Sequence, residues 1–332
     1  MSACINTIGI AGAGAWGTAL ATVATRAGCQ VTLWAHNPEV ADDINTAHEN
    51  RNYLPGVDLN KAIKATGTLA DIADCEAVLV VTPAQTLRTI ATNLAPYVTQ
   101  ELPVVICSKG LERDTNMALS DVLEHTMPQA VPCILSGPSF AADVARGLPT
   151  AVTLASKNIK TAEALVRTLG SSSFRPYASD DLIGAQIGGA VKNVLAIACG
   201  IVEGRSLGQS ARAALTSRGF AELVRFGLGH GAKIETLSGL SGLGDLILTC
   251  SSRMSRNMSL GYALGEGSSL PQILKIRKTV TEGVHTASVV CEIAKQKGIE
   301  MPICEAVRDI VEGSKTVDQA IENLMARPFR QE

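Results

Sequence analysis

Residues 9–21 read GIAGAGAWGTALA, a short apolar run that leads into three closely spaced glycines. Gly12, Gly14 and Gly17 form a G-x-G-x-x-G pattern after a predicted strand and at the start of a helical pattern. Glycines at this spacing allow a tight turn and a close backbone approach, and the helix N-terminus can hold a pyrophosphate. A glycine-rich turn without a ligand is the alternative, but the pattern that follows favours dinucleotide binding.

Around this stretch, short β-rich runs alternate with helical patterns up to about residue 180. The runs cover residues 6–11, 30–35, 77–83, 103–108, 132–137 and 150–155. Runs that are apolar on both faces and separated by helices predict parallel strands in a doubly wound sheet. The first part of the chain is therefore predicted to be an α/β domain of the Rossmann type.

The pattern changes once, near residue 180. Beyond it, apolar residues recur with a helical period, at positions 183, 187, 191, 194, 195, 198 and 202. Few β-rich runs follow. We therefore predict a Rossmann-type dinucleotide-binding domain over residues 1–180 and an all-α substrate domain over residues 181–332.

Composition limits the possible functions. The 332 residues are 46% hydrophobic, and 29 Lys and Arg against 31 Asp and Glu leave a net charge of −2, so no overall field favours nucleic acid. The nine cysteines never form CxxC, which argues against a disulfide framework or a metal site and suggests reduced thiols. The start MSACINTIGI and the lack of a long apolar run predict neither a signal peptide nor a membrane span, and hence a cytoplasmic protein.

The end of the second predicted strand bears on the choice of dinucleotide. An NAD-selective site usually places an Asp or Glu there, whereas LWAHNPE offers His36 and Asn37. Because nothing anionic would repel a 2′-phosphate, we predict NADPH, with NADH also possible. Two alternatives stay open: His36 is an exposed loop residue, or Glu39 turns back to the ribose despite the intervening Pro38.

Later strands also end in loops suited to a ligand, since ligands bind at the carboxyl ends of the strands in such sheets. ICSKGLE places Lys109 after one strand, and LSGPSFA places Gly137, Ser139 and Ala141 after another. A solvated loop lysine is the alternative for Lys109. For Ser139 the alternative is a helix cap, which is compatible with a ligand role.

Lys192 stands in the apolar run GGAVKNVLAIACG, where a desolvated ammonium group needs a partner. Its face of the predicted helix carries only small residues, namely Ala185, Gly188, Gly189, Ala196 and Cys199. Adjacent glycines cost about 1 kcal/mol each inside a helix, so we interpret them as room for a ligand close to the backbone. A lysine whose stem is buried and whose charge reaches water is the alternative.

Two further stretches could supply the missing partners. LSGLSGLGDLILTCSS places Asp245 after a glycine-rich turn, with Thr249 one helical turn on, although Asp245 could be a simple helix cap. SSRMSRNMSLG then supplies Ser255, Arg256 and Asn257, a cation and two hydrogen-bonding groups suited to phosphate oxygens.

The order and spacing of six motifs resemble the bacterial-type NAD(P)-dependent glycerol-3-phosphate dehydrogenases over residues 5–325. The motifs are GAGAWGTALA, SKGLE, SGPSFA, GAVKNVLAIACG, GLGDLILTCSSRMSRN and VTEGVHTA. The resemblance implies a Rossmann-type domain followed by a helical substrate domain, as in 6-phosphogluconate dehydrogenase-like folds. It also implies a cytoplasmic enzyme that interconverts dihydroxyacetone phosphate and sn-glycerol 3-phosphate for phospholipid synthesis, commonly as a homodimer.

The resemblance also assigns roles to residues. Lys192 would donate and accept the proton, with Lys109 and Asp245 beside it. The substrate pocket would be completed by Gly137, Ser139, Asn193, Thr249, Ser255, Arg256 and Asn257. The cofactor would contact the glycines and Ala15, Trp16, His36, Lys109, Ala141, Arg256, Val280 and Glu282. Ala15 stands where similar proteins often have serine, so only its backbone amide would serve the pyrophosphate.

Two other functions remain possible on the residues alone. A two-domain 3-hydroxyacid dehydrogenase would share the first domain and a buried lysine. Its substrate has no phosphate, so it would not need Ser255, Arg256 and Asn257 as phosphate-binding residues. A non-catalytic nucleotide-binding sensor would keep the glycines and have no reason to bring Lys109, Lys192 and Asp245 together.

Overall fold

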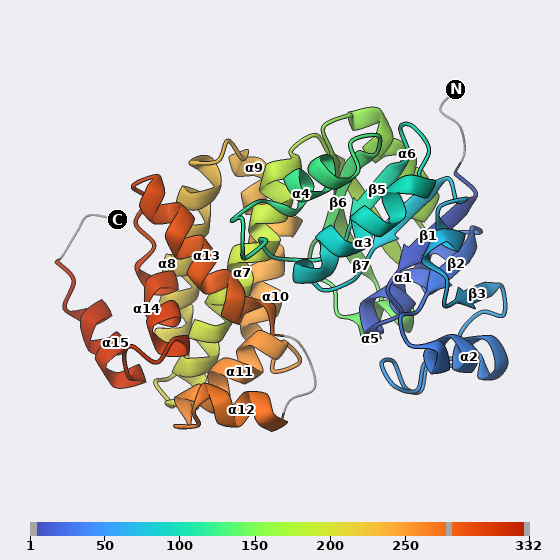
Figure 1. The fold of residues 1–332 in the computed structure, drawn as a ribbon. Helices are drawn as coiled ribbons and strands as arrows, with labels where there is room; N and C mark the ends of the chain where they lie inside the picture. Colours follow the sequence, from blue (N-terminus) through green and yellow to red (C-terminus); the bar gives the residue numbers. More distant parts are fainter. Residues whose placement is uncertain (1–4, 277–280, 329–332) are drawn as a thin grey trace. The chain divides into compact units, whose positions relative to one another are not determined.

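The computed structural model describes residues 5–276 and 281–328. The chain forms two compact units, each described by itself (Figure 1). The sheet unit runs to Glu112 and resumes over Met117–Gln186, and the helical unit comprises Arg113–Asn116 and the residues from Ile187 onward. The domain boundary expected near residue 180 stays a prediction, because compactness within one chain does not test which segments fold independently.

The sheet unit is built on one eight-stranded sheet with the strand order β3-β2-β1-β4-β5-β6-β7-β8. The strands are β1 (Thr7–Ala11), β2 (Gln30–Trp34), β3 (Ile63–Thr66), β4 (Ala77–Val80), β5 (Pro103–Ile106), β6 (Val131–Ser136), β7 (Thr150–Ser156) and β8 (Phe174–Ser179). All pairs from β3 to β6 are parallel, and the order reverses between β1 and β4. This reversal is the switch point at which doubly wound sheets bind ligands, and it confirms the predicted Rossmann-type class.

The prediction that all strands run parallel is wrong for one pair, because β7 pairs antiparallel with β6. The connection between them contains only α5 (Ala141–Ala145). A five-residue helix rises about 8 Å, which is too short to return along a six-residue strand of about 20 Å and restart in the same direction. The chain therefore turns back, and α6 (Ile159–Leu169) makes the next crossover to β8, which is parallel to β7.

The sequence prediction also missed β3 and β8. Both lie at the edges of the sheet, where a strand needs no apolar residues on both faces. β3 reads IKAT and β8 reads FRPYAS, with Pro176 in an edge position that tolerates a missing backbone donor. A search for doubly buried runs therefore could not detect them.

Two hydrophobic clusters cover the two faces of the sheet. Ile8 and Ile10 of β1 belong to one cluster and Ala11 to the other, as strand alternation requires. The first cluster includes residues of α1 (Ala15–Arg26), α2 (Pro38–Ala47) and α6. The second includes residues of α3 (Leu87–Leu94), α4 (Leu119–Thr126) and the short η1 (Leu69–Ile72). The short η2 (Ala84–Thr86) and η3 (Ala95–Tyr97) flank α3.

The described part of the helical unit contains helices and no strand, which confirms the predicted all-α second half. Its elements are α7 (Leu182–Gly204), which begins in the sheet unit, α8 (Gln209–Leu228), α9 (Ile234–Ser238), the π-helical turn η4 (Leu240–Gly244), α10 (Asp245–Ser251), α11 (Arg256–Gly265), α12 (Leu270–Ile276), α13 (Glu282–Gln296), α14 (Pro302–Val311) and α15 (Val317–Met325).

The long helix α7 is the centre of the helical unit. Its length and its mean hydropathy of 1.5 would allow it to cross a membrane, contrary to the expectation that no apolar run is long enough. However, 100% of its most apolar stretch is buried inside the protein. That burial is typical of a core helix.

Glycines let the backbones of other elements approach α7. A Cβ at Gly188 would overlap the carbonyl of Ser241 in η4, and one at Gly200 would overlap the carbonyl of Met258 in α11. We interpreted the small residues around Lys192 as room for a ligand. At Gly188 this interpretation is wrong, since the close neighbour there is the backbone of η4.

Candidate active site

The glycine-rich turn between β1 and α1 has the geometry that a pyrophosphate needs. Gly12 has φ of +116°, a conformation that favours glycine. A Cβ at Gly17 would overlap the carbonyl of Gly12, so this glycine is required for the close packing of helix on strand. Apart from its chain neighbours, no described residue comes within 4 Å of a Cβ built at Gly14, the N-cap of α1. The turn thus leaves open space beside a helix N-terminus, and these residues fit a dinucleotide.

Ala15 and Trp16 begin helix α1, and both are half-buried. Their positions in the first turn leave their amides without intrahelical partners, as at every helix start. One contact of this turn was not predicted from the sequence. The buried Asn50 donates to the carbonyl oxygen of Ala13, and an asparagine within HENRNYLPG carries no pattern that would have revealed it.

At the end of β2, the exposed His36 lies edge-on to Trp34, with ring centroids 5.9 Å apart. Asn37 is the N-cap of α2, where its side-chain oxygen accepts a hydrogen bond of 3.1 Å from the amide of Glu39. Pro38 occupies the first helical turn. Asn37 and Pro38 thus start the helix, and the choice between His36 and Glu39 as the ribose-facing residue stays a prediction.

Lys109 and Ser139 meet at one carbonyl group of the sheet unit. Lys109 Nζ donates to the oxygen of Gly137 at 3.1 Å, and Ser139 Oγ donates to the same oxygen at 3.2 Å. Lys109 is half-buried, so the alternative of a solvated loop lysine is wrong. The capping alternative for Ser139 is also wrong, because the N-cap of α5 is Phe140. Ala141, half-buried, opens that helix.

Gly137 has its own steric requirement. Its φ is +144°, and an added Cβ would lie 2.9 Å from Cα of Val152 in β7. Any side chain would therefore push the turn after β6 away from the sheet. This glycine keeps the carbonyl that receives Lys109 and Ser139 in place.

In the helical unit, Lys192 finds the partner that its burial requires. Its Nζ lies 2.5 Å from Asp245 Oδ1 and donates to Thr249 Oγ1 at 2.8 Å. Only 6% of Lys192 and 1% of Asp245 are exposed. Removing one partner of such a pair typically costs about 3–5 kcal/mol, because the other charge is left buried. The alternatives of a lysine that reaches water and of an Asp245 that only caps a helix are therefore wrong.

Asn193 and Asn257 join three helices next to this ion pair. Asn257 donates to Asn193 Oδ1 at 2.9 Å, and its own Oδ1 accepts the amide of Gly283 at 3.0 Å. Both asparagines are buried. The two ends of the Asn257 side chain thus bind protein groups, so its side chain also has a structural task that the sequence did not predict.

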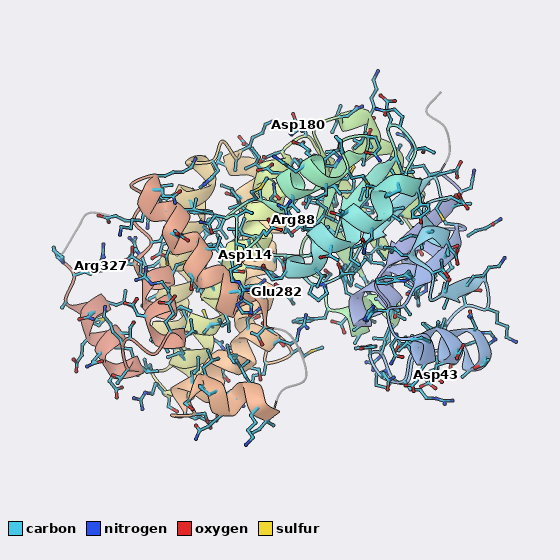
Figure 2. All side chains as sticks on the ribbon, in the orientation of Figure 1. Asp43, Arg88, Asp114, Asp180, Glu282 and Arg327 are labelled. Atoms are coloured by element: carbon cyan, nitrogen blue, oxygen red, sulfur yellow. The ribbon has the colours of Figure 1, made fainter. Side chains whose placement is uncertain are left out.

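The start of α11 carries the remaining residues predicted to bind phosphate. Ser255 is the N-cap, and its Oγ accepts a hydrogen bond of 3.3 Å from the amide of Met258. Arg256 is the first residue of the helix and is exposed. Glu282, labelled in Figure 2, begins α13 and is half-buried. Val280, also predicted to contact the cofactor, lies outside the described residues.

Thiols adjacent to these groups are held neutral. Burial raises the pKa of the Cys107 thiol, two residues before Lys109, well above its ordinary value. Cys250 follows Thr249, and a hydrogen bond with Cys199 together with burial raises its pKa as well. A neutral thiol is a poor nucleophile and a poor metal ligand. Within residues 5–276 and 281–328, no group of three His, Cys, Asp or Glu side chains could hold a metal ion.

Comparison with known proteins finds a match for each half of the chain. Residues 7–162 match a family model described as the N-terminus of NAD-dependent glycerol-3-phosphate dehydrogenase. Residues 181–322 match the model of its C-terminus. The two matches together cover most of the chain.

Individual relatives agree with these matches. A protein of Parvibaculum lavamentivorans named glycerol-3-phosphate dehydrogenase (NAD(P)+) is 58% identical over 100% of both chains. One of the same name from Maricaulis maris is 57% identical over 98% of this chain and 97% of its own. The crystal structure of a glycerol-3-phosphate dehydrogenase from Coxiella burnetii is similar with a TM-score of 0.93 and 37% identity, over 98% of this chain and 100% of that one.

Proposed function

The chain belongs to the family of NAD(P)-dependent glycerol-3-phosphate dehydrogenases, and we propose that Lys192 exchanges the proton in its reaction. The enzyme reversibly reduces dihydroxyacetone phosphate to sn-glycerol 3-phosphate. This family assignment sets aside a 3-hydroxyacid dehydrogenase and a non-catalytic sensor. The observation that supports the role of Lys192 is its buried contact with Asp245 and Thr249.

The chemistry of the ketone explains why an ammonium group is needed inside the protein. The bound nicotinamide supplies the hydride to C2 of dihydroxyacetone phosphate. Negative charge then develops on the carbonyl oxygen, and a positioned ammonium group stabilises it before giving up a proton. Asp245 and Thr249 fix the direction of Lys192 Nζ, so the proton is held in one place. The Asp245 carboxylate also offers an opposite charge to the buried ammonium group. By resemblance, Lys109 is a second ammonium group for the substrate.

We propose that the substrate phosphate binds at the start of α11. Arg256 is exposed there and can make a bidentate contact with phosphate oxygens. The first amides of the helix favour an anion at the same end. The Ser255 hydroxyl can still donate its proton while it caps the helix, and Asn193 and Asn257 complete the pocket by resemblance. Gly137 and Ser139 line it on the same grounds.

For the cofactor we propose NADPH, with NADH as a second substrate, because His36 and Asn37 follow β2 where an acid would exclude a 2′-phosphate. Ala141, Arg256, Val280 and Glu282 are proposed cofactor contacts by resemblance. We further propose that the enzyme acts in the cytoplasm, supplies phospholipid synthesis and forms a homodimer. We also propose that it binds no nucleic acid and has no membrane span.

The decisive measurement follows oxidation of NADPH with dihydroxyacetone phosphate as the varied substrate. We expect Arg256→Ala to raise KM for dihydroxyacetone phosphate about 10- to 100-fold, because a charge-assisted phosphate contact of roughly 1.5–3 kcal/mol is lost. Turnover of unphosphorylated dihydroxyacetone, already poor, should hardly change.

Arg253→Ala is the matched control. Arg253 precedes the same helix and already contacts Glu203 at 2.7 Å and the ring of Tyr262. Its loss should leave KM within about twofold, since no phosphate contact is removed. Because Arg256 is also a proposed cofactor contact, a modest rise in KM for NADPH is compatible with the phosphate assignment. If Arg256→Ala impairs turnover of both ketones equally, the phosphate assignment is wrong.

A further inference from the structure

Asn50 lies in the segment between α2 and β3 and is 1% exposed. Its Nδ2 donates to the carbonyl oxygen of Ala13 and to Thr18 Oγ1, both at 2.8 Å. Its Oδ1 accepts the amide of Tyr53 at 3.3 Å. A buried amide with partners at both ends is well ordered. Asn50 therefore joins the glycine-rich turn to the first turns of α1.

The contact to Ala13 sets the direction of a neighbouring amide. The carbonyl of Ala13 and the N–H of Gly14 belong to one planar trans peptide, so they point in opposite directions. Because Asn50 holds the Ala13 carbonyl on the protein side, the Gly14 N–H faces away from Asn50. A Cβ built at Gly14 would meet no other described residue within 4 Å, so there is open space beside the Cα of this residue.

The contact to Thr18 holds the helix in register with the turn. The amide of Thr18 donates to the carbonyl of Gly14 at 2.9 Å, so Thr18 belongs to the first hydrogen-bonded turn of α1. Asn50 thus fixes the peptide before Gly14 and the helical turn after it at the same time.

We propose that Asn50 is a positioning residue of the cofactor site, which aims the Gly14 N–H at the pyrophosphate of NADPH or NADH. The proposal rests on the assignment of the glycine-rich turn to the pyrophosphate. Asn50 does not itself contact the cofactor. Its amide prevents the 13–14 peptide from rotating, so that the donor is in place before the cofactor binds.

The first test measures the Kd of the protein for NADPH and for NADH from the fluorescence of the reduced nicotinamide. We expect Asn50→Ala to raise both values about tenfold, since one charge-assisted hydrogen bond to the pyrophosphate is weakened. The loss should be equal for both cofactors, because the pyrophosphate is common to them. The ratio of the two affinities should stay unchanged.

Asn45→Ala is the control for a merely structural role. Asn45 of α2 also makes two side-chain hydrogen bonds, both of 2.9 Å to the backbone of Ala65 in β3. We expect it to lower the unfolding temperature of the cofactor-free protein and to leave both Kd values within about twofold. If Asn50→Ala lowers the unfolding temperature but leaves both Kd values unchanged, Asn50 is structural and the proposal is wrong.

A milder pair of variants keeps the test decisive if Asn50→Ala does not fold. Thr18→Val removes one acceptor of Asn50, whereas Thr22→Val removes a hydroxyl that bonds only within α1, to Ala19. We expect Thr18→Val to raise both Kd values about threefold to fivefold and Thr22→Val to leave them unchanged. Equal Kd values in the two variants would overturn the proposal. Failure of the wild type to bind NADPH would instead overturn the cofactor site itself.

Discussion

The two units differ in the kind of group that each contributes to the proposed site residues. The sheet unit presents mainly backbone: the glycines of the turn after β1 and the carbonyl of Gly137, which receives Lys109 and Ser139. The helical unit presents buried side-chain charge, with Lys192 and Asp245 2.5 Å apart. Backbone groups need the right φ and ψ to act, whereas a buried charge needs a partner. The two regions should therefore fail in different ways when they are mutated.

The largest loss of activity should follow from a change to the buried ion pair of the helical unit, Lys192 and Asp245. Lys192→Met removes the ammonium group and keeps the apolar stem, so we expect kcat to fall at least about 10³-fold, in the range of general acid catalysis combined with electrostatic stabilisation. The Kd for NADPH should stay within about twofold, because the proposed pyrophosphate site belongs to the sheet unit. Single-turnover rates and NADPH fluorescence measure the two quantities separately. Near-normal kcat would remove Lys192 from the mechanism.

The same variant should lower stability, because Asp245 is then buried without its cation. A second change, Asp245→Leu, should recover most of the roughly 3–5 kcal/mol lost, since two apolar side chains can replace a buried ion pair. Activity should stay absent in the double variant. Stability that returns without activity would show that the ion pair is kept for catalysis and not for folding.

The second prediction concerns the stability of the sheet unit and compares two glycines of the turn after β1. Gly17→Ala places a Cβ on the carbonyl of Gly12, so we expect a loss of about 3 kcal/mol or more in unfolding free energy. Gly14→Ala meets no protein atom within 4 Å and should change stability by less than about 1 kcal/mol. Urea unfolding of the cofactor-free protein measures both. Equal losses would mean that the turn is not sterically constrained as described.

A third effect asks whether buried charge in the helical unit always serves catalysis. Glu222 of α8 is 1% exposed, and it accepts hydrogen bonds from the amides of Ile303 and Cys304 at the start of α14. Burial raises its pKa to about 7, although these amides oppose the shift. The folded protein therefore holds this proton more tightly than the unfolded chain does. Its contribution to stability is full below the ordinary glutamate range and is lost as pH rises through about 7.

We expect the wild type to lose about 2–3 kcal/mol of stability through Glu222 between pH 5 and pH 8. Glu222→Gln should remove this slope at a constant cost of about 1 kcal/mol for one lost acceptor. Glu235→Gln, at an exposed glutamate, is the control and should leave the slope unchanged. Since the group lies outside the reaction, kcat should not change in either variant. An unaltered slope in Glu222→Gln would assign the pH dependence to another group.

The contrast between the units also explains what could be predicted from the sequence. The glycine turn follows from local conformational rules, so its spacing and its place after a strand were sufficient. The need of Lys192 for a partner could be read from its apolar surroundings, and resemblance pointed to Asp245. The edge strands β3 and β8 and the reversal at β7 could not be predicted, because they depend on what lies beside each strand.

The contacts of several residues could likewise not be predicted from the sequence. Gly188 packs against Ser241 of η4, and Asn257 is hydrogen-bonded to Asn193 and Gly283 of two other helices. All these partners are distant in the chain, so no local pattern encodes the contacts. Ser255 was assigned to phosphate and is also a helix cap. A residue's type shows what it can bond, but only the fold shows which bonds are already used.

The smallest predicted effect concerns the end of β2, where a side chain of the sheet unit is expected to select between NADPH and NADH. His36→Asp places a carboxylate near the proposed 2′-phosphate of NADPH, and two charges some 4 Å apart repel by roughly 4 kcal/mol at an effective dielectric of about 20. His36 is exposed, so solvent reduces this, and we expect a loss of about 10- to 100-fold in kcat/KM for NADPH. The kcat/KM for NADH should stay unchanged or rise, because a carboxylate accepts a hydrogen bond from the free ribose hydroxyl.

If Glu39 sets the preference instead, Glu39→Gln shifts the ratio of kcat/KM for NADPH to that for NADH, and His36→Asp does not. Measuring kcat/KM for both cofactors in the wild type and the two variants decides between them, and an unchanged ratio in His36→Asp would show that His36 is only an exposed loop residue.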